Sequence, residues 1–202
     1  MNLPNKISMT RIIAIPFVVF FYLADFIPHG IGKIISLVLF SVIALTDFVD
    51  GHIARSRGLV TNLGKFLDPI ADKLLMTTGL LLVLADGTMV APWGVIMTII
   101  IIAREFIVSA LRQIAATKGF VLAADMLGKI KANFQPVAIA FFMLLAVHNV
   151  NPFLGGFTCA YTVICYSLMG IATVLTIISG VNYLLKNKAV FKEETTESKE
   201  EK

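Results

Sequence analysis

Charged residues are scarce in this chain, which limits the kinds of protein it can be. They make up 15% of the 202 residues, compared with about 25% in an average soluble domain. Hydrophobic residues make up 57%, above the roughly 45–50% that is usual for soluble proteins. This composition excludes an ordinary soluble domain. We therefore predict an all-α polytopic membrane protein.

Cysteine and histidine are also few, with two cysteines and three histidines. Cys159 and Cys165 lie in an apolar run without partner ligands, so we interpret them as reduced packing residues. His29 and His148 fall in predicted turns, and His52 stands at a free position of the motif described below, so metal binding by histidine is not expected. The net charge of +4 comes without a basic–aromatic stretch, so no nucleic-acid partner is expected.

Apolar runs, in contrast, recur along the whole chain. Several are shorter than the roughly 20 residues needed to cross a bilayer, so their polar flanks must continue the same helices. No internal repeat and no soluble domain are visible. We predict one membrane domain over residues 1–186, followed by a charged tail over 187–202 that is expected to be disordered. The predicted transmembrane helices are six, at residues 7–26, 32–57, 66–86, 92–118, 129–149 and 153–186.

Basic residues gather on one predicted side of the membrane. That side holds sixteen of the seventeen lysines and arginines and leaves only Lys33 on the other. By the positive-inside rule, both termini are expected in the cytoplasm, in a protein of the cell (inner or plasma) membrane.

Four aspartates stand at fixed intervals where the second predicted helix ends and the third begins. Each aspartate at membrane depth costs a few kcal/mol, so a group of four calls for a function. Spacings of three and four residues place each half of the motif on one stripe of its helix. Both halves also lie about 12 Å from the cytoplasmic turn. The motif reads Asp47-x-x-Asp50-Gly51-x-x-Ala54-Arg55, then eight residues, then Gly64-x-x-x-Asp68-x-x-x-Asp72.

Close carboxylates repel one another unless cations neutralise them. Hard oxygen ligands favour Mg²⁺ or Mn²⁺, and a pair of such ions can stabilise the oxygens of an in-line displacement at phosphorus. The small residues Gly51, Ala54 and Gly64 leave room for a substrate, and Arg55 can bind a diphosphate. The motif therefore favours phosphoryl transfer with two divalent ions. Pro69 is expected in the first turn of the third helix.

Other roles use similar residues and remain open on these grounds. A proton relay or a sodium site would need only some of the aspartates, and Asp–Arg contacts can simply hold helices together. A cation-coupled transporter would not need Arg55 and would usually carry more spans or repeated halves. An intramembrane prenyltransferase binds a diphosphate through aspartates and Mg²⁺, and the stretch from Asp68 to Asp72 alone would fit it.

The stretch from Asp47 to Asp72 resembles, without a mismatch, the signature of the CDP-alcohol phosphatidyltransferases. These six-helix membrane enzymes exchange the CMP of a CDP-linked lipid for an alcohol, and their di-metal site opens to the cytoplasm. The resemblance implies a homodimer among membrane lipids. It also implies that Asp47, Asp50, Asp68 and Asp72 hold the ions, that Asp72 is the general base, that Gly51 and Ala54 lie against the cytidine, and that Arg55 contacts the diphosphate.

Other segments resemble the branch of this family that uses CDP-diacylglycerol and glycerol 3-phosphate and makes phosphatidylglycerol phosphate. They are Leu3-Pro4-Asn5, the stretch from Arg104 to Arg112, and Gly128-Lys129-Ile130-Lys131. Asn5 is expected to reach the nucleotide pocket, or else to cap the first helix. Within this family, a cardiolipin synthase that uses phosphatidylglycerol as the acceptor is the nearest alternative.

The charge pattern supports an acceptor that carries a phosphate. Arg104 and Arg112 lie eight residues apart on one ridge of a helix, and Lys129 and Lys131 open the next helix at the same level. A dianionic phosphate suits such a group of cations. The alternative is that these are ordinary cytoplasmic basic residues, with Arg104 tied to a neighbour by Glu105. Lys73, beside Asp72, is expected to offset the repulsion between carboxylates or to contact phosphate.

Overall fold

The computed structural model describes residues 3–24, 26–57, 62–117 and 126–186, and it describes side chains for 9–24, 26–28, 30–46, 69–115, 126 and 128–186. Over these ranges the chain is helical and contains no strand, which confirms the all-α prediction. The long helices are α1 (Leu3–Leu23), α2 (Ile31–Arg57), α3 (Asn62–Ala85), α4 (Trp93–Thr117), α5 (Met126–Val150) and α6 (Thr158–Lys186). Two short 3₁₀ turns, η1 (Pro28–Gly30) and η2 (Gly155–Phe157), precede α2 and α6.

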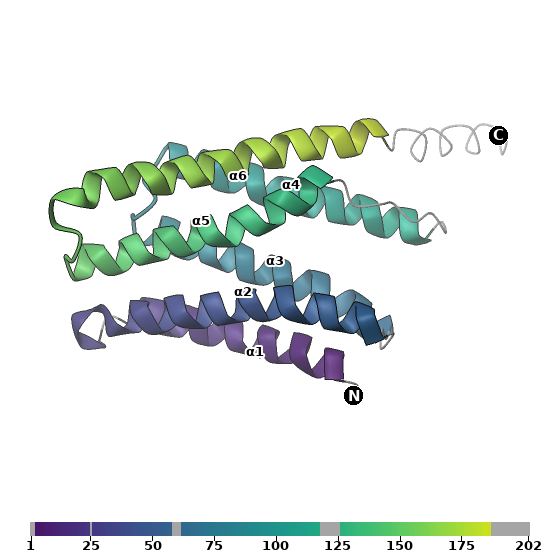
Figure 1. Ribbon diagram of the computed structural model, residues 1–202, viewed down its shortest axis with the longest axis horizontal. Helices are drawn as coiled ribbons and strands as arrows, with labels where there is room; N and C mark the ends of the chain where they lie inside the picture. The colour runs from purple at the N-terminus through teal and green to yellow at the C-terminus, as the bar shows by residue number, and fades with distance from the viewer. Residues whose placement is uncertain (1–2, 25, 58–61, 118–125, 187–202) are drawn as a thin grey trace, which may run out of the picture.

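The long helices run alternately in opposite directions and form one bundle (Figure 1). We call the end where α1 begins, α3 begins and α6 ends the motif end, and the opposite end the distal end. Helix α1 packs on α2 and α3, and α4 packs on α6. Helix α5 contacts α2, α3 and α6, so it occupies the centre of the bundle.

Large apolar side chains fill the space between these helices. Phe40 of α2, Leu80 of α3, Ile139 of α5 and Met169 of α6 are completely buried. Gly79 allows α3 to approach closely, because a Cβ atom there would lie 2.7 Å from the Ile139 side chain and 2.8 Å from that of Phe40. The close approach of α3 to α2 and α5 fixes the two helices that carry the aspartate motif.

Four helix starts differ from the sequence prediction by three or more residues. Helix α1 begins at Leu3 instead of residue 7, and α5 begins at Met126 instead of residue 129. Helix α3 begins at Asn62, so Pro69 lies inside the helix and the prediction that it occupies the first turn is wrong. A proline inside a helix lacks the N–H that would bond to the carbonyl four residues earlier, and its ring crowds that carbonyl. The residues on both sides of Pro69 are nevertheless helical. Helix α6 begins at Thr158 instead of residue 153, because Nδ1 of His148 accepts the backbone N–H groups of Phe153 (3.0 Å) and Leu154 (3.3 Å) and holds them in a turn.

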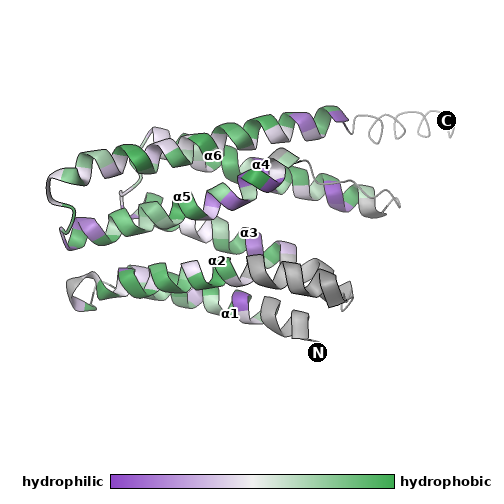
Figure 2. Ribbon diagram, in the orientation of Figure 1, coloured by the Kyte–Doolittle hydropathy of each residue, from purple (hydrophilic) through white to green (hydrophobic). Residues whose placement is uncertain are grey.

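The surface of the bundle is rich in apolar side chains. Among the residues that the structure describes, three helical stretches are long and apolar enough to cross a membrane, namely Trp93–Ala115, Gly128–Val150 and Gly155–Lys186. Shorter apolar helices cover Met9–Leu23 and Ile31–Thr46. In Figure 2 the coloured parts of the helices are mostly hydrophobic, with hydrophilic positions near the start of α5. Exposed apolar surface on this scale is typical of contact with lipid.

Candidate active site

Both halves of the aspartate motif lie on helices, as the spacing predicts. Helix α2 is continuous through Asp47 and Arg55, and α3 is continuous through Gly64 and Asp72. The two helices contact each other, and one ends where the other begins. The side chains of several predicted site residues lie outside the described part, so their roles stay predictions; these positions are Asn5, Asp47, Asp50, Gly51, Ala54, Arg55, Gly64 and Asp68.

Asp72 is the one motif aspartate whose side chain is described, and it is partly buried. It lies within electrostatic range of Lys131, which comes from α5. Its neighbour Lys73 lies within electrostatic range of Glu105 on α4, and the Lys73 ammonium also donates to the Pro69 carbonyl over 3.1 Å. The motif half on α3 therefore faces charged side chains of α4 and α5.

Those charged side chains form a group that we call the Glu105 cluster, made of the partly buried Arg104 and Glu105 and the buried Lys131. Oε1 of Glu105 accepts a hydrogen bond from the Arg104 Nη1 group over 3.2 Å and a second from the Lys131 ammonium. Lys131 is only 3% exposed. Two cations thus share one carboxylate, and the contact between Arg104 and Glu105 considered from the sequence is confirmed.

The other two predicted phosphate-binding residues are arranged differently. The Arg112 guanidinium lies over the ring of Tyr183 on α6, 6.0 Å from its centroid. Lys129 is exposed at the start of α5. The structure therefore brings Arg104 and Lys131 together, whereas Arg112 contacts α6 nearer the motif end and Lys129 faces outward.

Helix α6 contributes two residues that sequence reasoning missed. Oγ of Ser179 accepts a hydrogen bond from the Arg104 Nη2 group over 2.8 Å. The next residue, Gly180, lies against the Arg104 side chain. The only sequence signal was a small Ser–Gly pair inside an apolar run, which says nothing about the helix that it faces.

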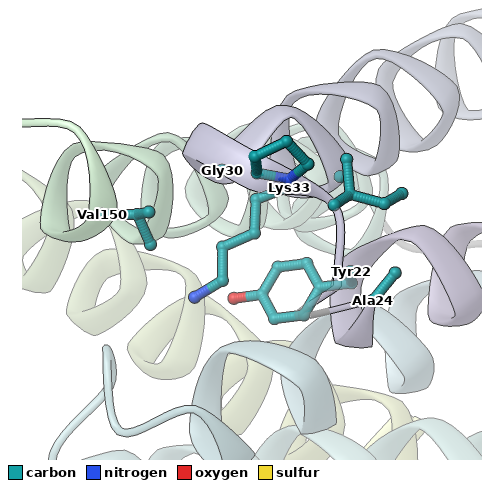
Figure 3. Close-up of a pocket in the computed structure, with 8 residues that line it drawn as sticks. Tyr22, Ala24, Gly30, Lys33 and Val150 are labelled. Atoms are coloured by element: carbon teal, nitrogen blue, oxygen red, sulfur yellow. The ribbon is translucent and has the colours of Figure 1, made fainter.

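A small cavity of about 160 Å³ lies at the distal end, far along the bundle from the motif (Figure 3). Its lining consists of Tyr22, Ala24, Ile27, Pro28, Gly30, Gly32, Lys33 and Val150. Figure 3 shows the Lys33 ammonium beside the Tyr22 hydroxyl, because both groups donate a hydrogen bond to Asp86.

Asp86 joins three elements at this distal end. Its Oδ2 accepts from the Tyr22 hydroxyl (2.7 Å) and from the Lys33 ammonium (2.9 Å), and its Oδ1 accepts from the Thr88 backbone N–H (2.9 Å). Burial raises the pKa of the Asp86 carboxyl, but hydrogen bonds from Lys33, Tyr22 and Thr88 outweigh it and hold that pKa below its ordinary value. Lys33, the lone basic residue predicted on the outer side, is thus neutralised within the fold.

The motif residues suit divalent cations by their chemistry. Among the described side chains no group of three potential ligands occurs, and of the four motif aspartates this set includes only Asp72. The four carboxylates stand on two helices in contact, and they offer only oxygen ligands. Such a donor set fits Mg²⁺ or Mn²⁺.

Comparison with known proteins identifies a family and similar bacterial proteins. A family model described as CDP-alcohol phosphatidyltransferase matches residues 1–178. A protein of Bacillus subtilis (strain 168) is 40% identical over 197 residues, which cover 92% of this chain and 95% of that protein. A protein of Rickettsia felis is 33% identical over 190 residues, which cover 94% of this chain and 97% of that protein. Both are named CDP-diacylglycerol–glycerol-3-phosphate 3-phosphatidyltransferase.

Proposed function

We propose, because this chain belongs to the CDP-alcohol phosphatidyltransferase family, that it transfers the phosphatidyl group of CDP-diacylglycerol to sn-glycerol 3-phosphate. The products are phosphatidylglycerol phosphate and CMP. The observation that carries the choice of acceptor is the pairing of Arg104 and Lys131 on one carboxylate, with Lys131 within electrostatic range of Asp72. Two convergent cations beside the proposed base suit an alcohol that carries a phosphate.

Asp72 has the central role in the proposed reaction. Its carboxylate takes the proton from the primary hydroxyl of glycerol 3-phosphate, and that oxygen attacks the lipid-side phosphorus of CDP-diacylglycerol. A new phosphorus–oxygen bond forms while the bond between this phosphorus and the oxygen of CMP breaks. Arg104 and Lys131 hold the acceptor's own phosphate, so that its hydroxyl stays near Asp72.

The remaining motif residues are assigned to the nucleotide and the ions. Arg55 contacts the diphosphate and stays with the CMP phosphate as it leaves, while Gly51, Ala54, Gly64 and Asn5 line the nucleotide pocket. Members of the family generally depend on a divalent metal, and Asp47, Asp50, Asp68 and Asp72 would hold two ions here. When bound, such ions supply positive charge that stabilises the diphosphate as negative charge develops on the leaving group.

The proposal includes a membrane arrangement. All six long helices cross the cell membrane, both termini lie in the cytoplasm, and the motif end opens to the cytoplasm. The gathering of basic residues at the motif end supports this orientation. The family resemblance is the support for a homodimer.

CMP release tests the proposed function directly. Purified full-length protein receives CDP-diacylglycerol, Mg²⁺ or Mn²⁺, and one acceptor at a time: glycerol 3-phosphate, phosphatidylglycerol, inositol or serine. We expect rapid release with glycerol 3-phosphate only. Release with phosphatidylglycerol alone would identify a cardiolipin synthase, and the phosphate-binding assignment of Arg104 would then be wrong.

A further inference from the structure

Helix α6 holds the Arg104 side chain at two neighbouring positions. The Ser179 hydroxyl accepts from Arg104 Nη2 over 2.8 Å. A Cβ atom at position 180 would lie 3.1 Å from Arg104 Cγ and 3.7 Å from its Nε, so the side chain runs along the bare backbone of Gly180. Ser179 and Gly180 are both buried. A hydrogen bond and a close backbone therefore fix the guanidinium from the same helix.

The Ser179 hydroxyl has a role that its neighbours on α6 lack. It donates to the Thr176 carbonyl over 3.2 Å, which leaves its oxygen free to accept from Arg104. The hydroxyls of Thr173 and Thr176 donate to carbonyls of α6 itself, over 2.8 and 2.6 Å. Of these three hydroxyls, that of Ser179 bonds to another helix, whereas those of Thr173 and Thr176 bond within α6.

The guanidinium is thereby held between helices. Glu105 accepts from Nη1 on one side, and Ser179 accepts from Nη2 on the other. Gly128 at the start of α5 lies close as well, since a Cβ atom there would be 3.7 Å from Nη2. An arginine fixed in this way loses little conformational freedom when it binds a phosphate.

We propose that Ser179 and Gly180 are positioning residues for the acceptor's phosphate, acting through Arg104. They hold the guanidinium so that it and the Lys131 ammonium present a fixed pair of cations. Arg104, Lys131 and the nearby Lys73 carry three positive charges against the two negative charges of Glu105 and Asp72, so the group retains positive charge for a dianion. The inference rests on the proposed function, because the ligand of Arg104 is the acceptor's phosphate only if glycerol 3-phosphate is the acceptor. The family match ends at residue 178 and does not include either residue.

Substitutions on α6 test this role with matched controls. Ser179→Ala removes the hydroxyl that accepts from Arg104 Nη2. Gly180→Ala adds a methyl group in close contact with Arg104 Cγ, which displaces the Arg104 side chain. Thr173→Val is the control for a lost buried hydroxyl, and Gly170→Ala is the control for an added methyl group, because a Cβ atom at position 170 meets nothing within 4 Å. Each full-length variant is purified, its melting temperature is measured, and its kinetics are compared with those of the unmodified chain.

The expected result is a change in one kinetic constant. Ser179→Ala raises the KM for glycerol 3-phosphate about 10-fold, as expected for a buried charged donor that loses its acceptor. Gly180→Ala raises it about threefold. For both variants, kcat and the KM for CDP-diacylglycerol stay within about twofold, and both controls keep all three constants. In an Arg104→Lys background, Ser179→Ala has no further effect on the KM for glycerol 3-phosphate. Ser179 acts only through the Arg104 guanidinium, which this background lacks.

The outcomes separate this inference from the function on which it rests. If the unmodified chain releases CMP with glycerol 3-phosphate but Ser179→Ala and Gly180→Ala behave like their controls, the positioning role is wrong and the function stands. Equal changes in the KM of both substrates would also contradict it, since they indicate general damage to the fold. If Ser179→Ala does not fold, the KM of Gly180→Ala for glycerol 3-phosphate tests the positioning role by itself. If the unmodified chain does not use glycerol 3-phosphate, the proposed function fails first and the inference fails with it.

Discussion

At the scale of single residues, Asp72 is the motif aspartate whose surroundings the structure describes. It faces Lys131 and stands next to Lys73, so its carboxylate lies where α3 meets the cations of α4 and α5. The sequence predicted this meeting of acids and bases from two separate patterns, the aspartate spacing and the basic residues at 104–131. It could not predict which basic residues meet, because contacts between helices depend on how each helix is rotated and tilted.

Asp72→Asn tests the proposed base. We expect kcat to fall by at least about 100-fold, the contribution typical of a positioned general base. Asparagine has nearly the same size and removes one negative charge from a group of repelling carboxylates, so the fold should keep its melting temperature. CMP release by purified protein measures the effect. Near-normal turnover in a folded Asp72→Asn variant would contradict the assignment.

Glu105 is the residue that holds the buried Lys131 beside the partly buried Arg104. Glu105→Gln removes the negative charge and leaves the 3% exposed Lys131 beside Arg104 without its hydrogen-bonded carboxylate, with only the more distant charge of Asp72 to offset it. Breaking a buried ion pair from one side costs about 3 kcal/mol, so the melting temperature should fall clearly. The double variant Glu105→Gln with Lys131→Met removes the uncompensated charge and should recover much of the loss while glycerol 3-phosphate use stays impaired. A melting temperature unchanged in Glu105→Gln would show that the cluster does not contribute to stability.

At the scale of helices, the sequence predicted the elements well and their starts less well. Length alone showed that the short apolar runs had to include polar flanks, and this placed α2 and α4 within one residue of their observed bounds. The start of α6 depends on His148, whose bonds to Phe153 and Leu154 are tertiary features of the turn. Apolar periodicity does not report such a bond, and it cannot report that Ser179 faces Arg104.

The distal turns give a prediction about pH, because Asp86 joins α1, α2 and the turn after α3. Its pKa lies below the ordinary value of 3.8 in the folded protein. The folded state therefore binds the proton less readily than the unfolded state, so Asp86 stabilises the fold above about pH 4 and this stabilisation is lost as the pH falls further. Melting temperatures of the unmodified chain and of Asp86→Asn, measured from pH 7 to pH 3, should converge at the acid end. A difference in melting temperature that stays constant over that pH range would contradict this contribution of the ionised Asp86 carboxylate.

At the scale of the whole molecule, the remaining question is how the bundle lies in the membrane. The structure places the start of α1 and the end of α6 at the same end (Figure 1). The six long helices run alternately in opposite directions. If each of them crosses the bilayer, both termini must therefore lie on the same side. Which side that is depends on the charge asymmetry, since the geometry of the bundle is the same in either orientation.

Single cysteines at the two ends determine the side. In a background that carries Cys159→Ser and Cys165→Ala, Gly156→Cys places a thiol in η2 at the distal end, where a side chain meets nothing within 4 Å. Gln113→Cys places one on an exposed position of α4 near the motif end. A membrane-impermeant maleimide added to intact cells should label position 156 and should label position 113 only after the membrane is permeabilised. Both thiols should react in detergent, which controls for reactivity. The reverse pattern in intact cells would place Asp72 and the Glu105 cluster outside, away from the cytoplasmic supply of glycerol 3-phosphate, and would overturn the proposed orientation.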